Sequence, residues 1–143
     1  MQLKQISVFL ENKSGRLSRV TQILKEANID ILALCVADSN EYGIVRMIVD
    51  KPAKAMEELE KSKFTVSLTN VIGVTIPDSA GGLATVIDLL AKQNISMEYI
   101  YAFTSRKIGE AIIILRVEDT QSAIEILTDH HVKLITHNEI IRE

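Results

Sequence analysis

The chain begins with alternating apolar and polar residues and then changes to a helical spacing. Alternation over residues 2–10 is typical of a half-buried strand. A turn follows over residues 12–15, and over residues 17–27 the apolar positions recur every three or four residues. We therefore predict a strand, a turn and an amphipathic helix, with Asn12 or Ser14 as the helix cap.

Three more strand patterns and a second helix follow in the first half of the chain. We predict strands over residues 31–37, 44–49 and 64–68, and a hairpin over residues 39–43. A helix is expected to begin at Pro52, because the fixed φ of proline suits the first helical position. The first half thus has the order βαββαβ.

The second half repeats the first. Residues 12–34 align with residues 78–100 without a gap, and six of the 23 pairs are identical. Ordinary residue usage would give about one or two identities in such a window. The identical pairs are Gly15/Gly81, Leu17/Leu83, Val20/Val86, Leu24/Leu90, Asn28/Asn94 and Ile29/Ile95. The chain is therefore read as two copies of one unit.

The second copy is expected to contain the same elements as the first. Strands are predicted over residues 71–76, 97–104, 111–117 and 132–140, and helices over residues 83–93 and 120–129. A βαββαβ unit folds most simply into a four-stranded antiparallel sheet with two helices on one face, the ferredoxin-like arrangement. We predict an α+β protein of two such modules, residues 1–69 and 70–143.

The second strand of each copy is apolar on both faces. In the first copy, Leu34 and Val36 alternate with Ala33 and Cys35. A sheet with helices on one face only usually carries polar residues on the other face. We therefore expect the sister module or another chain to cover the second face.

Composition excludes several classes of function. The 143 residues are 47% hydrophobic, and 16 basic against 19 acidic residues leave a net charge of −3. This balance disfavours nucleic-acid binding, which needs a basic surplus. The single cysteine, Cys35, excludes an intramolecular disulfide and fits a cytoplasmic protein. No apolar stretch reaches membrane-spanning length, and we expect no signal peptide and no membrane anchor.

An aromatic stripe on the second strand of the second copy has three interpretations. Tyr99, Tyr101 and Phe103 alternate along that strand. They could pack in a core or interface, line a pocket for an aromatic or heterocyclic amino acid, or stack on RNA bases. The acidic composition argues against RNA.

Little in the sequence supports catalysis. His130 and His131 are expected at the end of the last helix, and His137 in the last strand, which is no metal-ligand spacing. The glycine turns match neither the Walker pattern nor the dinucleotide fingerprint. We expect no enzyme activity, no metal and no cofactor.

The turn between the first strand and the first helix carries a resemblance to a known family. Asn-Lys-Ser-Gly-Arg-Leu, followed by an amphipathic helix and Ala-Asn-Ile-Asp-Ile, resembles the ACT domain, a small module that binds ligands and regulates enzymes of amino-acid metabolism. The turn of that family reads roughly Asn/Asp-x-Pro-Gly-x-Leu. The chain keeps its Asn/Asp, Gly and Leu positions in both copies, with Ser14 and Ala80 where proline is common.

The resemblance implies a free-standing sensor that binds an amino acid where modules meet. The ligand would be held by the turn and by the start of the second strand. Its predicted contacts are Asn12, Ser14, Gly15, Arg16, Leu17 and Asp30 in the first copy, and Asp78, Ala80, Gly81, Gly82, Leu83 and Ser96 in the second. The resemblance also implies a homodimer or higher oligomer. A structural adaptor that binds a protein without any small ligand remains the alternative.

Physical chemistry independently supports a ligand site at the turn. Glycines before a helix allow close backbone approach, and the helix start offers amide donors and a positive dipole end to a carboxylate. The same residues could also be ordinary turn and cap residues. The two turns differ, because the first is flanked by Lys13, Arg16 and Arg19 and the second contains Gly81 and Gly82. We therefore expect either two sites of unequal affinity, or one working site and one structural copy.

Overall fold

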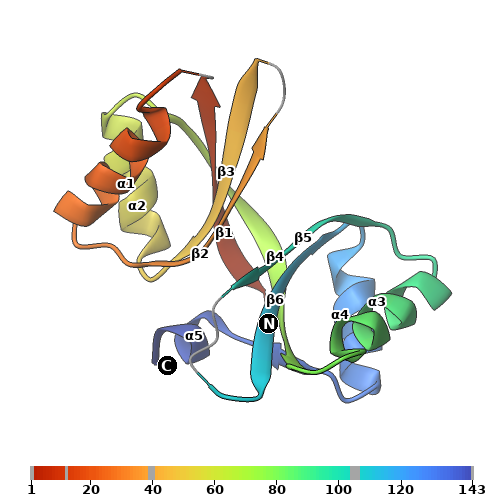
Figure 1. The fold of residues 1–143 in the computed structure, drawn as a ribbon. Helices are drawn as coiled ribbons and strands as arrows, with labels where there is room; N and C mark the ends of the chain where they lie inside the picture. Colours follow the sequence, from red (N-terminus) through yellow and green to blue (C-terminus); the bar gives the residue numbers. More distant parts are fainter. Residues whose placement is uncertain (1, 12, 39–40, 104–106, 143) are drawn as a thin grey trace. The chain divides into compact units, whose positions relative to one another are not determined.

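The chain forms two compact units, which a computed structural model describes for residues 2–11, 13–38, 41–103 and 107–142. Lys4–Thr69 is the first unit, and the rest of the described chain is the second unit. Figure 1 shows the two longer helices of each unit gathered on one face of its strands, and the short C-terminal helix of the second unit apart from them.

The first unit contains four strands and two helices. They are β1 (Leu3–Glu11), α1 (Arg16–Glu26), β2 (Ile31–Asp38), β3 (Tyr42–Val49), α2 (Pro52–Lys61) and the start of β4 (Thr65–Pro77). The strand β3 lies between β1 and β2 and is antiparallel to both, and β4 is the neighbour of β1 on its other side. The strand order β4–β1–β3–β2 is that of a ferredoxin-like sheet.

The second unit repeats this order with the remainder of β4 as its first strand. Its other elements are α3 (Gly82–Lys92), β5 (Met97–Phe103), β6 (Glu110–Val117), α4 (Thr120–Asp129), β7 (Lys133–Ile135) and α5 (His137–Arg142). The strand β6 is antiparallel to β4 and β5, and β7 is antiparallel to β4. The α+β architecture of two ferredoxin-like modules is thus confirmed.

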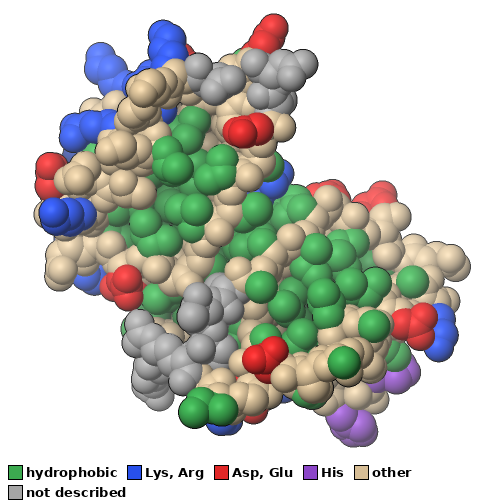
Figure 2. Space-filling model, viewed as in Figure 1, with side chains coloured by type: hydrophobic (Ala, Val, Ile, Leu, Met, Phe, Trp, Pro, Cys, Tyr) green, Lys and Arg blue, Asp and Glu red, His purple; other side chains and the backbone are tan. Residues whose placement is uncertain are grey.

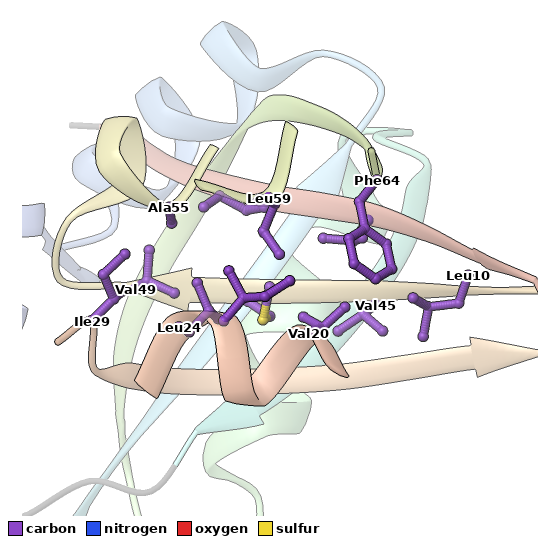
Figure 3. Close-up of a cluster of buried hydrophobic side chains, with 13 residues drawn as sticks. Leu10, Val20, Leu24, Ile29, Val45, Val49, Ala55, Leu59 and Phe64 are labelled. Atoms are coloured by element: carbon purple, nitrogen blue, oxygen red, sulfur yellow. The ribbon is translucent and has the colours of Figure 1, made fainter. Parts of the chain in front are cut away.

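A hydrophobic core fills the space between helices and sheet in each unit. Figure 3 shows Val20 and Leu24 of α1 and Leu59 of α2 pointing toward the sheet, where Val45 of β3 faces them. The second unit has an equivalent cluster, with Leu90 in the place of Leu24. Burial of one such side chain is worth about 1.5 to 3 kcal/mol. Of the apolar identities of the repeat, Val20/Val86 and Leu24/Leu90 are therefore core positions in both units, whereas Leu17/Leu83 is not.

The helices α1 to α4 are each followed by a residue in the left-handed conformation. Asn28 and Asn94 follow α1 and α3 in the left-handed region, both with φ of 56°. The next amide, that of Ile29 in the first unit, donates to a carbonyl in the last turn of α1 (N–O 2.9 Å). This is a Schellman motif. Lys63 and His131 take the same left-handed position after α2 and α4.

The prediction of two separate strands at the junction of the copies was wrong. Residues 64–68 and 71–76 were expected to be distinct, but Thr65–Pro77 forms the single strand β4. No glycine or proline separates the two patterns, and β-branched residues such as Val66, Thr69 and Val71 favour an extended chain throughout. The same strand therefore serves both units.

The predicted last strand, residues 132–140, was also mostly wrong. Only Lys133–Ile135 is a strand, and His137 begins the helix α5 instead of lying in a strand. Thr136 starts this helix, because its amide and hydroxyl donate to a carboxylate oxygen of Glu139 (2.6 and 3.0 Å) and its hydroxyl oxygen accepts from the Glu139 amide (3.4 Å). This reciprocal capping box overrides the apolar pattern.

One residue of β1 belongs to the second unit. Leu3 is fully buried and groups with the residues that follow Asn70. A Cβ on Gly73 would lie 2.7 Å from Leu3 Cδ1 and 2.5 Å from Ile135 Cγ2. Position 73 therefore has no room for a side chain, because the side chains of Leu3 and Ile135 occupy that space.

Hydrophobic side chains also reach the surface of both units (Figure 2). Leu34 and Val36 of the edge strand β2 are 39% and 40% exposed, whereas Ala33 is buried and Cys35 half-buried. Leu34 pairs with Met47, so the exposed pair lies on the face that also carries the helices. The cover expected for β2 remains a prediction.

Candidate functional site

Each predicted turn leads from a strand end into an uncapped helix. Gly15 is the N-cap residue of α1 with φ of 85°, and Gly81 is the N-cap residue of α3 with φ of 87°. Neither helix has a side-chain hydrogen bond at its cap. A left-handed N-cap suits glycine, which explains why both copies carry it. The start of each helix keeps its positive dipole end free of a side-chain acceptor.

The expected side-chain caps are therefore not found. Ser14 is exposed and gives no cap to α1, and Asn12 lies outside the described residues. Asp78 does not cap α3, and its backbone amide instead donates to the Gly109 carbonyl (2.9 Å). The physical reason is spacing, because the cap position falls on the glycine that these side chains precede.

Gly82 has a structural reason to be glycine. A Cβ at this position would overlap the carbonyl oxygen of Pro77 at the end of β4. By contrast, a Cβ on Gly81 or Gly15 would meet nothing within 4 Å. Of the two adjacent glycines, Gly82 thus packs against its own unit, and Gly81 faces open space.

A groove of about 510 Å³ opens beside the turn of the second unit. Three walls form it: the end of β4, the turn with the start of α3, and the segment that joins α4 to β7. It is lined by Thr75, Ile76, Pro77, Ser79, Ala80, Gly81, Gly82, Thr85, Val86, His131, Val132 and Lys133. We call it the second-unit groove. Ala80, Gly81 and Gly82 of the predicted site line it, whereas Asp78 and Leu83 are not among its lining residues.

The equivalent groove of the first unit is much smaller, at about 140 Å³. Its lining residues are Phe9, Leu10, Glu11, Arg16, Tyr42, Lys63, Phe64 and Thr65. The Arg16 guanidinium lies over the Phe64 ring, 5.5 Å from its centroid, and Arg16 Nη2 is 3.6 Å from Glu11 Oε2. We call this the first-unit groove. Of the predicted residues of the first copy, Arg16 lines it.

Charge is concentrated at the first-unit groove. Lys13 Nζ lies 3.0 Å from Glu11 Oε2, and Arg16 approaches the same oxygen. The hydrogen bond and charge of Lys13, together with the charge of Arg16, lower the pKa of Glu11. Glu11 therefore stays anionic at neutral pH and holds both cations at the rim of this groove.

Asp30 and Ser96 lie away from the turns of their own units. Each is at the start of the second strand of its unit, beyond the far end of α1 or α3. Asp30 lines a separate groove of about 530 Å³ with Asp50 and Lys51, and its amide donates to Asp50 Oδ1 (2.9 Å). Ser96 lines the equivalent groove of about 370 Å³ in the second unit. Within one unit the predicted site therefore divides into two places.

The two leucines of the turn motif occupy matching positions. Leu17 and Leu83 are each 38% exposed in the first turn of their helices. Their side chains thus remain partly open to solvent in both units, and neither lines the groove beside its turn.

Sequence reasoning missed the third wall of each groove. Lys63, Phe64 and Thr65 form it in the first unit, and His131, Val132 and Lys133 form it in the second. A repeat alignment carried past the second helix would have paired these segments. In the second unit, the position of this segment beside the turn depends on pairing between β4 and β7, in which Thr75 faces Lys133.

The aromatic stripe belongs to the sheet. Tyr99 and Tyr101 stack with ring centroids 6.5 Å apart, and Tyr101 is 8% exposed. The side chain of Phe103 lies outside the described part of the structure. Because Tyr101 is buried, it is unavailable as an open stacking platform for RNA bases.

Within the described residues, no group of three or more histidine, cysteine, aspartate or glutamate side chains is arranged to hold a metal ion. His130 Nδ1 lies 2.8 Å from the Ile126 carbonyl oxygen at the end of α4. No helix in this part of the chain is long and apolar enough to cross a membrane.

Comparison with known proteins gives the family. The family model described as an ACT domain pair matches residues 1–142. The chain therefore belongs to the ACT domain family, with one ACT module in each half. The resemblance of the two turns to that family is confirmed.

Individual relatives show how far the similarity extends. Protein BT0572 from Bacteroides thetaiotaomicron has 38% identity and a TM-score of 0.92, over 98% of this chain and 96% of that one. The regulatory subunit of aspartate kinase from Thermus thermophilus shares the fold, with a TM-score of 0.63 at 18% identity over 88% and 91% of the two chains.

Part of the chain is also similar in sequence to an enzyme subunit. The acetolactate synthase small subunit of Haemophilus influenzae is 38% identical over 58 residues. The match covers 39% of this chain and 36% of the length of that subunit.

Proposed function

We propose that this protein is a non-catalytic regulator that binds a free amino acid at the turn between strand and helix. The observation that carries the proposal is the second-unit groove, which joins an uncapped helix start to apolar walls. Its volume of about 510 Å³ falls in the range of small-molecule sites. Membership of the ACT domain family supports a binding role over a catalytic one.

The groove has complementary chemistry for a zwitterion with an apolar side chain. The start of α3 and Lys133 favour a carboxylate. Ile76, Val86 and Val132 offer apolar contact to a side chain. Asp78 precedes the turn and is exposed, and we propose that it receives the ammonium group.

Regulation would follow from linkage between ligand and assembly. A ligand that binds one arrangement of modules more tightly favours that arrangement by its difference in affinity. The local similarity to an acetolactate synthase small subunit favours a partner enzyme of amino-acid metabolism. We further propose a homodimer or higher oligomer in the cytoplasm. The remaining predicted contacts, Asp30 and Ser96 among them, stay part of the proposal as contributions from a neighbouring module.

The test is a thermal-shift screen of the whole chain against the twenty protein amino acids at millimolar concentration. A ligand at 100 times its dissociation constant adds roughly 2.7 kcal/mol of stability. A shift confined to one amino acid or one chemical class is expected. If no amino acid shifts the midpoint, the structural adaptor, which binds a protein partner without a small ligand, becomes the better explanation.

Two variants examine the ends of the bound zwitterion. Lys133→Gln and Asp78→Ala should each weaken binding about fivefold, because a partly exposed charge contact is worth about 1 kcal/mol. Isothermal titration with the amino acid found in the screen measures this effect. Lys92→Gln is the matched control, since Lys92 pairs with Asp88 on the surface of α3 (2.8 Å) and lines neither groove. Equal affinity in all four proteins would remove the proposed contacts.

A further inference from the structure

We infer that the amino acid binds in the second-unit groove and is kept out of the first-unit groove by the Arg16 side chain of the chain itself. The inference rests on the proposed function and adds which copy is occupied and what closes the other. It assigns Arg16 a role opposite to the ligand contact expected from sequence.

The two grooves are the same place in the repeat. Glu11 and Arg16 of the first unit correspond to Pro77 and Gly82 of the second, 66 positions later. After two extra residues in the second copy, Phe64 corresponds to Val132. Each of these residues lines its own groove. Differences in size and charge therefore come from the substitutions and not from different locations.

The two grooves differ first in size. The first-unit groove, at about 140 Å³, is well below the usual size of small-molecule sites, whereas the second-unit groove, at about 510 Å³, is within it. Phe64 is larger than Val132, and the Arg16 side chain extends over its ring. In the second unit Gly82 has no side chain to extend over Val132.

Charge separates them as well. The Glu11 carboxylate stands where Pro77 is neutral, and it already pairs with both Lys13 and Arg16. An incoming carboxylate would meet this anion at the start of α1 and would compete with it for the guanidinium. The stacking of Arg16 on Phe64 further stabilises the closed arrangement. No equivalent anion lines the second-unit groove.

The asymmetry also fits the backbone. Position 82 cannot carry arginine without displacing the end of β4, because any Cβ there would overlap the Pro77 carbonyl oxygen. The second unit therefore cannot close its groove in the way the first does. The changes Val132→Phe and Pro77→Glu install the ring and the anion of the first unit and should obstruct the groove without an arginine.

The experiment compares five versions of the full chain by isothermal titration. They are the wild type, Arg16→Ala, Val132→Phe, Pro77→Glu and the control Arg19→Ala, whose side chain is exposed on α1 and lines neither groove. The probe is the amino acid that gives the largest thermal shift among the twenty. The glycine amide signals of Gly15 and Gly81 in ¹⁵N-labelled protein report which turn is occupied.

We expect one ligand per chain in the wild type and in Arg19→Ala, with the Gly81 signal perturbed and the Gly15 signal unchanged. Arg16→Ala should add a second binding event that moves the Gly15 signal. Val132→Phe and Pro77→Glu should each weaken binding at least tenfold. Pro77 is exposed, so Pro77→Glu keeps the test valid if Val132→Phe does not fold.

Three results would overturn the inference while leaving the proposed function intact. They are two equal sites in the wild type, perturbation of Gly15 in place of Gly81, and a single unchanged site in Arg16→Ala. Absence of binding by every version would instead overturn the proposed function, and the inference with it.

Discussion

A residue that follows each of the helices α1 to α4 has a left-handed backbone conformation, which is unfavourable for most side chains. Lys63 follows α2 with φ of 67°, and an ordinary side chain in this region costs roughly 1 to 2 kcal/mol. Asparagine tolerates it better, which accounts for Asn28 and Asn94 at the same position after α1 and α3. Sequence therefore marks two of these four helix ends by asparagine and leaves the other two unmarked.

Lys63→Gly should stabilise the protein by about 1 kcal/mol, because glycine relieves the left-handed backbone conformation. Asn28→Gly should give a smaller gain, since asparagine already fits. Chemical denaturation of both variants measures the difference. A destabilised Lys63→Gly protein would show that contacts of the lysine outweigh its backbone strain.

Gly82→Ala should destabilise the protein by about 1 to 3 kcal/mol, because the new methyl group overlaps the Pro77 carbonyl oxygen. The change at the equivalent position of the first unit, Arg16→Ala, introduces no overlap and should cost at most about 1 kcal/mol, through loss of the contact with the Phe64 ring. Urea denaturation of the two variants, side by side, provides the comparison. Equal stabilities would contradict the close approach of Gly82 to β4.

At the scale of elements, α4 differs from α1, α2 and α3 in having a side-chain cap. Asp119 accepts from the Ser122 amide (3.1 Å) and the Ser122 hydroxyl (2.6 Å). These two hydrogen bonds lower the pKa of Asp119, and the bond from the Ser122 hydroxyl has the larger effect. The folded protein therefore favours the carboxylate over the acid.

Asp119→Ala should lower the melting temperature at neutral pH, because α4 loses its cap. The sign of the pH dependence follows from the lowered pKa. The stabilisation by Asp119 is complete above the ordinary aspartate pKa of about 4 and is lost as pH falls through the lower folded value. Melting curves from pH 7 down to pH 2 should show the gap between wild type and variant closing only in acid. A gap that is constant with pH would exclude the charged cap.

Elements defined by local patterns were the ones that sequence predicted best. The helices α1 to α4 follow from apolar spacing, and most strands from alternation. The continuity of β4 and the change from β7 to α5 depended instead on weaker signals, namely the lack of a breaker and the pair Thr136 and Glu139. In the second-unit groove, Gly81 and Gly82 of the predicted contacts are lining residues, but Val132 and Lys133 could be placed there only by strand pairing distant in sequence.

At the scale of the whole molecule, the chain is a duplicated fold with unequal copies. Both units keep the strand order, the core leucines and the glycine-capped helix starts. They differ at positions beside the turn, where the first unit has Glu11, Arg16 and Phe64 and the second has Pro77, Gly82 and Val132. The two copies thus share the residues that fold each unit and differ in residues that line the grooves.

Leu3→Ala should cost about 2 to 5 kcal/mol, because Leu3 is fully buried and its loss leaves a cavity above Gly73. The loss should be felt in the second unit, to which Leu3 belongs. Hydrogen exchange should therefore become faster at the amides of β4 and β7. Leu68→Ala is the control, since Leu68 is 41% exposed and its truncation should change stability by less than about 0.5 kcal/mol. Uniform acceleration in both units would argue against this assignment.

The position of Leu3 has a consequence for the order of events in folding. Along the sequence, Leu3 is far from Gly73 and farther still from Ile135. Closing so long a loop is entropically costly, so this contact should form after the local structure of each unit. The Leu3 contact should therefore form after the folding transition state. The variant Leu3→Ala should unfold faster, while its folding rate stays nearly unchanged. During synthesis Leu3 is made before both of its partners and would stay exposed until β7 has been made.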